Sequence, residues 1–344
     1  IVGSGPCGVT LSYIQPFGTD NCPNPITELA GGQGGAGNYY VYGGFYTETY
    51  LVTDASGNTD ECSFTITIED ALDPVITCPE DITVPNDAGI CGATVTYSNP
   101  LDVDNCSGWT TTLTEGLPSG SIFPLGETTV EFTITDDAGN VTTCSFVVTV
   151  EDVEAPVITT CPADRDITAD TNCMGAVPNL IPEVVATDNC DPFAALTISQ
   201  SPIAGTLFGG AHGDTQEVVM TVTDLAGNST SCTVILTLID ETNPTIDCSN
   251  IVTDYTADAG ACSYTELGAG LDPLFDDNCA ATISHDYIFA PNTNTLAGSS
   301  YPVGMTTVVW TATDENGNTA SCTIVITVTD DEDPVALCQD ITVN

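Results

Sequence analysis

Aspartate and asparagine recur at two places in each of four sequence repeats, and they are the side chains best suited to chemistry. The first place is an Asp-Asn-Cys triplet, whose cysteines are Cys22, Cys106, Cys190 and Cys279. The second is an Asp-x-x-Gly-Asn loop, whose aspartates are Asp54, Asp136, Asp224 and Asp314. Carboxylate and amide oxygens are hard ligands, and in sufficient number they suit a divalent cation. The alternative is that these residues only form turns, because Asp and Asn readily adopt turn conformations.

The Asp-x-x-Gly-Asn loop lies within an eighteen-residue segment that occurs four times. Its copies span residues 53–70, 135–152, 223–240 and 313–330. Gly and Asn tolerate the positive φ of a tight turn, and the residues after the turn alternate with period two. Phe64, Ile66 and Ile68 fall on one face of this second strand, while Ser and Thr mostly occupy the other. The segment is therefore predicted to be a β-hairpin with one buried face.

The spacing of these hairpins divides the chain into domains. Their cysteines follow one another at intervals of 82, 88 and 90 residues, at Cys62, Cys144, Cys232 and Cys322. A chain of 344 residues also exceeds what one hydrophobic core usually organises. The predicted domains are residues 1–70, 71–152, 153–240 and 241–330, and residues 331–344 are predicted to form the first strand of a following repeat. Repeat 1 lacks a first strand of its own.

The charge balance excludes several classes of partner. The chain has 48 acidic residues and one basic residue, Arg165, for a formal net charge of −47. Such a charge repels nucleic acid and anionic membrane surfaces, so neither is expected as a partner, and cations are. The hydrophobic content of 42% is that of a packed protein rather than an acidic tail. No run of about 18 apolar residues is present, so direct membrane insertion is not expected.

Sixteen cysteines, at positions that recur from repeat to repeat, point to an oxidising, extracellular compartment. A zinc site is not expected, because no Cys-x-x-Cys pair occurs and the histidines are His212 and His285 alone. The chain does not begin with Met, and we expect it to be a processed, exported segment. The sequons at Asn105, Asn140 and Asn228 are candidates for glycosylation.

Four cysteines allow three connectivities in each repeat. If the first strand of a repeat lies parallel to its last strand, Cys78 and Cys144 each precede by six residues the valine that ends the strand. This favours pairing the first cysteine with the fourth, as Cys78–Cys144, Cys161–Cys232 and Cys248–Cys322. The second would then pair with the third, as Cys7–Cys22, Cys91–Cys106, Cys173–Cys190 and Cys262–Cys279.

Short strands between turn residues, without helical periodicity, predict an all-β protein of tandem sandwiches of the immunoglobulin or fibronectin III kind. The segments CPEDITV, CGATVTY, DNC, FPLGETTV and TDDAGNVTTCSFVVTV between residues 78 and 150 carry a family resemblance. They resemble the HYR (hyalin repeat) module, and the resemblance covers the whole chain as four repeats in a linear rod. It implies an extracellular immunoglobulin-like domain, associated with adhesion and present in bacterial surface proteins as well as animal ones. The family carries no catalytic residues to transfer.

In a sandwich of this type, the Asp-Asn-Cys loop and the Asp-x-x-Gly-Asn loop both lie at the end where the chain enters, so they meet the preceding linker. The first junction is predicted to gather Asp70, Asp73, Asp104, Asn105 and Asp136. The second is predicted to gather Asp152, Glu154, Asp188, Asn189 and Asp224, and the third Asp240, Glu241, Asp277, Asn278 and Asp314. Several oxygen donors without a nearby Lys or Arg suit Ca²⁺ better than Mg²⁺, which tends to keep its water.

Motifs for catalysis are absent from the sequence: it has no G-x-S-x-G, no H-E-x-x-H and no phosphate-binding glycine loop, and we predict that the chain is not an enzyme. His212 and His285 are expected on the polar surface. The glycine-rich stretch 30–45 is expected to be a flexible surface loop rather than a binding site. Tyr39, Tyr40, Tyr42 and Tyr46 in or beside it are expected to pack on strands.

The two ends of the chain look complementary. Residues 334–343 read as a first strand, which repeat 1 lacks, so we expect this segment to add a strand to repeat 1 of a neighbouring copy, with Cys338 bonded to Cys62. Asp330 and Asp333 would then complete a fourth calcium site with Asp20, Asn21 and Asp54. The alternative is a window on one longer polypeptide.

The function expected from these features is that of an extracellular structural protein, a calcium-stiffened and disulfide-stapled fibre or adhesive stalk. The first alternative is an adhesin that binds cell-surface glycans or proteins through the variable loops of repeats 1, 3 and 4. A weaker one is a spacer from a larger secreted enzyme.

Overall fold

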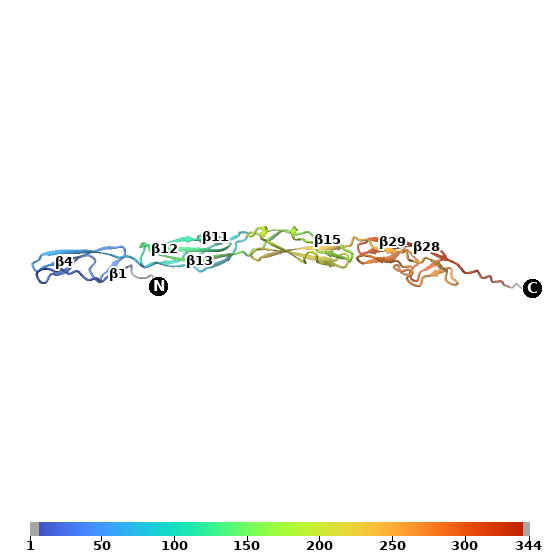
Figure 1. The fold of residues 1–344 in the computed structure, drawn as a ribbon, viewed down its shortest axis with the longest axis horizontal. Helices are drawn as coiled ribbons and strands as arrows, with labels where there is room; N and C mark the ends of the chain where they lie inside the picture. Colours follow the sequence, from blue (N-terminus) through green and yellow to red (C-terminus); the bar gives the residue numbers. More distant parts are fainter. Residues whose placement is uncertain (1–6, 340–344) are drawn as a thin grey trace, which may run out of the picture. The chain divides into compact units, whose positions relative to one another are not determined.

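The computed structural model describes residues 7–339, which form strands joined by turns and two short 3₁₀ segments. The chain folds into two compact units, with the boundary between Glu154 and Ala155. The first unit contains repeats 1 and 2, and the second contains repeats 3 and 4 (Figure 1). No helix among the described residues is long and apolar enough to cross a membrane.

The first unit consists of thirteen strands over its described residues. Repeat 1 contains β1 (Gly8–Thr10), β2 (Ile26–Gly31), β3 (Tyr39–Val41), β4 (Phe45–Thr53) and β5 (Thr59–Thr67). Repeat 2 contains β6 (Val75–Thr77), β7 (Ile82–Pro85), β8 (Gly92–Val95), β9 (Leu101–Val103), β10 (Thr110–Glu115), β11 (Ser121–Pro124), β12 (Gly126–Thr135) and β13 (Val141–Glu151).

The second unit repeats this order. Repeat 3 contains β14 (Val157–Thr160), β15 (Arg165–Thr168), β16 (Met174–Ala176), η1 (Ile181–Glu183), β17 (Val185–Thr187), η2 (Phe193–Ala195), β18 (Thr197–Ser201), β19 (Leu207–Gly209), β20 (Thr215–Thr223) and β21 (Ser229–Ile239). Repeat 4 contains β22 (Thr245–Asp247), β23 (Asp254–Thr256), β24 (Ser263–Thr265), β25 (Leu274–Asp276), β26 (Ala281–His285), β27 (Ser300–Pro302), β28 (Gly304–Asp314) and β29 (Thr319–Thr329).

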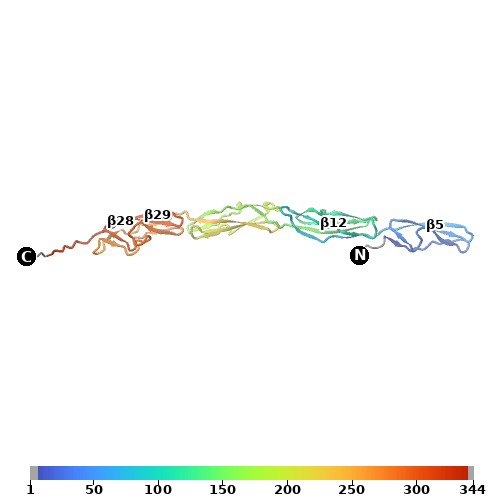
Figure 2. The ribbon, with the colours of Figure 1, turned by 180° about the vertical axis from the view of Figure 1, so that it is seen from behind.

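Repeats 2, 3 and 4 share one topology, that of an immunoglobulin-like sandwich. In repeat 2 a four-stranded sheet has the order β10-β12-β13-β7, and β6-β9 and β11-β8 form two short pairs. The strands of the predicted hairpin, β12 and β13, pair along their length, as do β28 and β29 in repeat 4 (Figures 1 and 2). The first strand β7 runs parallel to the last strand β13, with Val84 opposite Val150. The condition on which the first-to-fourth cysteine pairing rested, a first strand parallel to the last, is therefore met.

Period-two alternation builds the core of each of these repeats. Along β13, Phe146, Val148 and Val150 are buried and point to one face, where they pack on Phe123 and Val130. Fully burying a side chain of this size contributes about 1.5–3 kcal/mol. Corresponding clusters form around Leu236 in repeat 3 and Trp310 in repeat 4, so each of these three repeats has a core of its own.

Repeat 1 departs from the pattern at Glu48, a fully buried side chain opposite Phe64. The same position holds Val130, Val218 and Val308 in the other repeats. Tyr40 donates its hydroxyl to Glu48 Oε1 at 2.7 Å, and the Gln33 backbone N–H donates to the same oxygen at 2.9 Å. The glycine-rich stretch therefore folds over this carboxylate and contributes β3, which pairs with β1. The expectation of a flexible surface loop is wrong for this segment.

Each first-to-fourth disulfide expected in repeats 2, 3 and 4 is present, as Cys78–Cys144, Cys161–Cys232 and Cys248–Cys322. The second-with-third pairing inside a repeat is wrong. Cys106 is bonded to Cys7 of repeat 1, and Cys279 of repeat 4 is bonded to Cys173 of repeat 3. The expected pairs Cys7–Cys22, Cys91–Cys106, Cys173–Cys190 and Cys262–Cys279 therefore do not form. Inside each unit, therefore, the second cysteine of one repeat is bonded to the third cysteine of the next.

Cys22, Cys62, Cys262 and Cys338 are exposed and unbonded. The strand expected over residues 334–343 lies partly outside the described residues. Residues 334–339, which are described, are exposed and form no strand.

Candidate metal centres at the repeat junctions

The linker between repeats 1 and 2 is tied to the Asp-x-x-Gly-Asn loop of repeat 2. The side-chain amide of Asn140 donates to the carbonyl oxygens of Asp70 and Leu72, at 3.2 and 3.3 Å, and to Asp136 Oδ2 at 2.8 Å. Asp136 Oδ1 accepts the Asn140 backbone N–H at 2.7 Å. Burial is the largest single influence on the pKa of Asp136 and raises it. The hydrogen bonds together outweigh burial, so the pKa of Asp136 is lowered. Asp136 therefore shapes the loop that receives the linker.

At the same junction, the Asp-Asn-Cys loop brings Asp104 beside the linker residue Asp70. Asp104 Oδ2 accepts the backbone N–H of Cys106 at 2.9 Å, while Asp104 Oδ1 is buried without a hydrogen-bond partner. Asn105 Oδ1 is also buried without one, and its amide nitrogen lies 3.4 Å from Asp70 Oδ2. Ligand atoms of Asp70, Asp104 and Cys106 lie within 4.8 Å of one another. The sulfur of Cys106 is in a disulfide and cannot act as a thiolate, which leaves the oxygens.

The junction between repeats 3 and 4 brings three carboxylates together. Oxygens of Asp240, Asp277 and Asp314 lie within 4.8 Å of one another. Asp240 is fully buried, and its Oδ1 accepts the Thr242 N–H at 3.0 Å while its Oδ2 has no partner. Asp277 Oδ1 and Asn278 Oδ1 are buried without partners as well. Burial, together with the nearby charges of Asp240 and Asp314, raises the pKa of Asp277.

These oxygen sets fit a hard divalent cation. Buried carboxylates without a countercharge repel one another and lose hydration, so they need a cation or a proton. The one arginine of the chain is already engaged elsewhere, because Arg165 forms a two-pronged ion pair with Glu183 at 2.5 and 3.0 Å. Calcium accepts six to eight oxygen ligands in flexible geometry, including carboxylate, amide and backbone oxygens.

Among the other predicted ligands, Asp73 and Glu241 lie outside the two clusters described above. Asp73 and Glu241 are exposed, and Glu241 Oε2 accepts a hydrogen bond from the Thr168 hydroxyl at 3.2 Å. Glu154 Oε2 accepts the Gly89 N–H at 2.7 Å, and Asp152 Oδ1 accepts the Glu154 N–H at 3.2 Å.

The remaining predicted ligands of the second junction belong to repeat 3. Asp188 Oδ1 is buried without a partner, and Asp224 accepts both the backbone N–H and the side-chain amide of Asn228. Asn189 lies beside Cys190, toward whose sulfur its amide points at 3.6 Å.

The residues of the expected fourth site belong to repeat 1 and to the segment after β29. Asp20 and Asn21 are exposed in repeat 1, and Asp54 accepts three hydrogen bonds from its own loop, led by the Asn58 side chain, which lower its pKa. Asp330 and Asp333 are exposed after β29.

Neither histidine lies in a carboxylate cluster. His212 Nδ1 accepts the backbone N–H of Asp240 at 3.2 Å. His285 is half-buried and packs edge-on against Trp310 with ring centres 4.9 Å apart, so the expectation of polar surface is wrong for this residue.

The asparagines of two sequons contact the linker between repeats 1 and 2. The Asn140 amide holds the linker, and the Asn105 amide points toward Asp70. The side chain of Asn228 donates to Asp224 Oδ2 at 2.9 Å.

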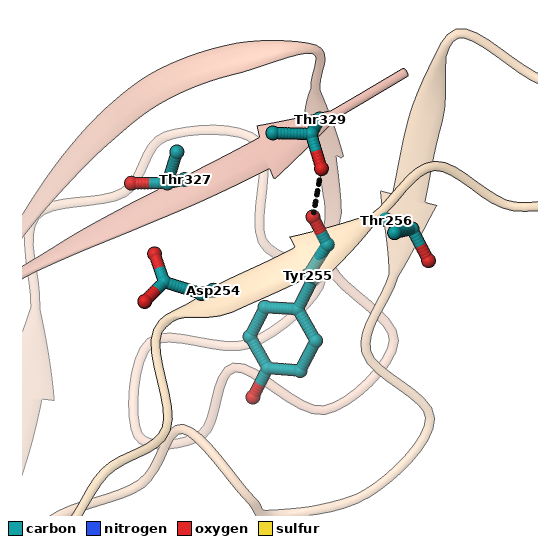
Figure 3. Close-up of a pocket in the computed structure, with 5 residues that line it drawn as sticks. All are labelled: Asp254, Tyr255, Thr256, Thr327 and Thr329. Carbon is teal, nitrogen blue, oxygen red and sulfur yellow. Dashed lines mark hydrogen bonds between the residues drawn. The ribbon is translucent and has the colours of Figure 1, made fainter. Parts of the chain in front are cut away.

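A surface hollow of about 500 Å³ lies along the parallel pair of β23 and β29. It is lined by Asp254, Tyr255, Thr256, Thr327 and Thr329. The Thr329 hydroxyl donates to the Tyr255 carbonyl oxygen at 3.3 Å, and the Tyr255 ring points away from the threonines (Figure 3). Asp254 is the one carboxylate among these five lining residues.

Comparison with known proteins identifies the family. The model of the HYR domain matches residues 69–150 and 239–328, which are half of the chain. Hyalin of Lytechinus variegatus is 30% identical over 94% of this chain, and hyalin of Strongylocentrotus purpuratus is 29% identical over 97%. The chain spans 59% and 27% of the length of these two relatives. Among solved structures, the protocadherin gammaB4 extracellular domain is 14% identical at a TM-score of 0.36, covering 95% of this chain and 66% of that one. The chain therefore belongs to the HYR domain family.

Proposed function

We propose that this chain is a non-catalytic, extracellular structural protein whose tandem sandwiches are fixed to one another by Ca²⁺ and by disulfides, and that it assembles head to tail into a fibre or adhesive stalk. Disulfides in all three complete repeats support the extracellular placement, because such bonds persist in oxidising compartments. The relatives named hyalin support a role outside the cell.

The observation that carries the calcium proposal is Asp240 Oδ2. This carboxylate oxygen is fully buried, has no hydrogen-bond partner, and belongs to a cluster with Asp277 and Asp314. A buried charge without compensation is strongly destabilising. A calcium ion would supply the missing charge and bind oxygens from both repeats at once. Removal of the ion would leave the carboxylates to repel one another and open the junction.

Calcium is preferred over magnesium on ligand chemistry. The available donors are carboxylate and amide oxygens from the linker, the Asp-Asn-Cys loop and the Asp-x-x-Gly-Asn loop, which gives a large and uneven ligand set. Mg²⁺ demands near-octahedral geometry and retains water, whereas Ca²⁺ tolerates irregular sites. Affinities of roughly 10⁻⁴ to 10⁻³ M, typical of extracellular calcium modules, would suffice.

The proposed head-to-tail assembly would use β5, which is an edge strand of repeat 1 over the described residues. In repeats 2, 3 and 4 the last strand pairs in parallel with a first strand, namely β7, β15 and β23. No described strand pairs with β5 in this way, and Cys62 on β5 is exposed and unbonded. An unpaired strand edge accepts an added strand. The segment beginning at Pro334 of another copy has the sequence of such a first strand.

The test is calcium titration of the full 344-residue chain, by calorimetry and by X-ray scattering with and without chelator. Asp240→Asn should weaken or remove one binding event, whereas Glu241→Gln, which removes the same charge one position away, should not. Calcium should raise the melting temperature and increase the maximum dimension. An unchanged melting temperature and dimension, or equal effects of the two substitutions, would refute the calcium proposal.

A second candidate function is ligand binding by a variable loop. In repeat 4, Ile288 and Phe289 are 83% and 74% exposed, and Phe289 rests edge-on against Tyr287 with ring centres 5.7 Å apart. An exposed aromatic of this kind can stack on a sugar or insert into a partner protein. Phe289→Ala should then reduce attachment of the protein to cell-surface glycans or proteins without changing its melting temperature, and unchanged attachment would exclude this loop.

A further inference from the structure

The disulfide between repeats 1 and 2 ends inside the oxygen cluster of their junction. Cys106, the last residue of the Asp-Asn-Cys triplet, is 4% exposed and is bonded to Cys7. Its sulfur lies within 4.8 Å of an oxygen of Asp70 and of an oxygen of Asp104. The corresponding group of ligand atoms between repeats 3 and 4 comes from three aspartates. The first junction therefore differs from the other in having a sulfur within its cluster.

The loop that carries this sulfur also carries oxygens without partners. Asp104 is 8% exposed, and its Oδ1 is buried without a hydrogen bond. Asn105 Oδ1 is buried without one as well, and the amide nitrogen of Asn105 lies 3.4 Å from the sulfur of Cys106. Asp104 Oδ2 is already engaged, because it accepts the backbone N–H of Cys106 at 2.9 Å. Two oxygens beside the sulfur thus remain able to bind a ligand.

A surface hollow of about 240 Å³ gives access to the disulfide. Its lining residues come from both repeats and include Gly8, Val9, Asp70, Asn105 and Cys106. Cys7 is half-buried, whereas Cys106 is 4% exposed. A small thiol in the hollow therefore reaches the sulfur of Cys7 more readily, and the sulfur of Cys106 is the one that leaves when the bond opens.

We propose that opening of the Cys7–Cys106 disulfide turns this junction into a site for a thiophilic divalent cation such as Zn²⁺ or Cd²⁺. The ligands are the Cys106 thiolate, Asp70 and Asp104, and the fourth position is filled by Asn105 Oδ1 or by water. With the bond closed, the junction offers oxygens alone, as in the calcium site proposed above. The new site deepens that function and rests on the same oxygens, but it does not require that calcium binds.

The donor set fits such a cation in number and in kind. Zn²⁺ binds cysteine sulfur at about 2.3 Å and carboxylate oxygen at about 2.0–2.2 Å, usually with four tetrahedral ligands. Ligands at these distances stand roughly 3.5 Å apart, so a shift of about 1 Å brings a group that spans 4.8 Å onto one ion. A thiolate selects soft and borderline metals, whereas Ca²⁺ takes oxygen ligands. The redox state of one bond thus sets the class of cation.

The opening step consumes two molecules of a small thiol such as glutathione. The thiolate of the first attacks the sulfur of Cys7, the S–S bond breaks, and Cys106 leaves as a thiolate that binds the metal. The thiolate of the second attacks the mixed disulfide on Cys7, which releases the oxidised small disulfide, and Cys7 takes up a proton. The protein disulfide is reduced, the two small thiols are oxidised, and one of their two protons stays in solution.

Metal binding and reduction favour each other in this scheme. The thiophilic ion binds the reduced junction and not the oxidised one, so it stabilises the reduced form by mass action. Cd²⁺ at 100 times its Kd should shift the equilibrium with a glutathione buffer about 100-fold toward the open bond. The Cys173–Cys279 bond of the same chain is the comparison, because its junction has a group of three aspartates, and its shift should be at least tenfold smaller.

A second experiment frees Cys106 by substitution and needs no reductant. Cys7→Ala is made in a full chain whose exposed, unbonded cysteines are replaced, as Cys22→Ser, Cys62→Ser, Cys262→Ser and Cys338→Ser. Cd²⁺ should give this chain the ultraviolet charge-transfer absorption of a cadmium–thiolate bond, with one ion per chain. The same chain with Cys106→Ala should give none. Hydrogen-exchange protection of β12 and β13 shows whether repeat 2 is folded in each variant.

Two substitutions that remove the same charge separate the site from the acidic surface around it. Asp104→Asn in the Cys7→Ala chain should weaken Cd²⁺ binding at least tenfold, whereas Asp73→Asn should leave it unchanged, because Asp73 is exposed in the linker and outside the cluster. Equal weakening by the two substitutions, no charge-transfer absorption with repeat 2 folded, or equal shifts of the two disulfides would overturn the proposal.

The calcium proposal is tested separately in the chain that keeps Cys7, where the disulfide is closed. Calorimetry there reports calcium binding to the oxygens without a thiolate. Calcium binding without the cadmium–thiolate signal would refute this inference alone. The cadmium–thiolate signal without calcium binding would refute the calcium proposal and leave the thiolate site standing.

Discussion

The side-chain amide of Asn140 lies 3.2 Å from the carbonyl oxygen of Asp70, seventy positions earlier in the chain, and so joins the loop of one sandwich to the linker that precedes it. Asn318 makes the same contact with Asp240 at 3.2 Å. The Asn of the Asp-x-x-Gly-Asn loop is thus more than a turn former in these two repeats, because it satisfies backbone carbonyls of the linker.

Alanine substitution of this Asn should increase hydrogen exchange in the linker by different amounts in different repeats. Asn140→Ala should increase hydrogen exchange in the linker peptide 69–74 about tenfold, in line with about 1–2 kcal/mol for a lost partly buried hydrogen bond. Asn318→Ala should have a smaller effect on its own linker, because Asn316 also donates to the Asp240 carbonyl, at 2.6 Å, where repeat 2 has Ala138. Asn58→Ala is the control, since Asn58 holds no linker in the isolated chain, and equal effects at all three sites would contradict this account.

Asp104→Asn should weaken one calcium-binding event at least tenfold while repeat 2 stays folded. The amide keeps an oxygen to accept the Cys106 N–H but loses the charge that would bind the ion. In chelator the substitution should stabilise the chain, because it removes the repulsion between Asp104 and Asp70. The melting temperature in chelator should therefore rise relative to the unsubstituted chain. Calorimetry measures the loss of calcium affinity, and thermal unfolding with calcium and with chelator measures the change in melting temperature. Unfolding of repeat 2 would mean that Asp104 supports the core.

The two kinds of disulfide should differ in what their removal loosens. Cys161–Cys232 closes 71 residues within repeat 3, so replacing both by Ala should cost about 2–5 kcal/mol and destabilise that core. Cys173–Cys279 joins two repeats, so Cys173→Ala with Cys279→Ala should leave both cores protected from hydrogen exchange and lower calcium affinity at their junction. Loss of core protection in the second variant would contradict the assignment of this bond to the junction.

The ion pair of Arg165 and Glu183 gives a pH prediction. Hydrogen bonding to Arg165 lowers the pKa of Glu183, so its contribution to stability is present above the unfolded-state pKa of Glu and disappears as the pH falls through the lowered value. Glu183→Gln should therefore lower the melting temperature of repeat 3 slightly at pH 7 and have no effect near pH 2. Because the pair is partly exposed, 150 mM salt should reduce the effect at pH 7. A difference that persists at pH 2 would point to packing instead.

The features that follow from local periodicity can be predicted from the sequence. Features set by contacts between repeats are harder to predict from it. Val84 opposite Val150 follows from the alternation in the two strands and from equal offsets to Cys78 and Cys144. Asp240, Asp277 and Asp314 meet because their loops share one end of the sandwich. The same reasoning places Cys173 at the other end, away from Cys190, and a pairing confined to one repeat therefore fails. The burial of the Glu48 carboxylate does not follow from the sequence pattern. Alternation marks this position as inward-facing, but it does not show that Tyr40 and Gln33 fold over the carboxylate.

The parallel pairing of β7 with β13 has a mechanical consequence. When a repeat is pulled by its two ends, the first and last strands are drawn past each other, so the hydrogen bonds between Ile82–Pro85 and Val148–Glu151 carry the force together in shear and do not open one by one. If they do fail, Cys78–Cys144 still withholds the intervening 66 residues from extension, a contour length of roughly 220 Å. A row of such repeats therefore lengthens little under tension before its disulfide bonds carry the force.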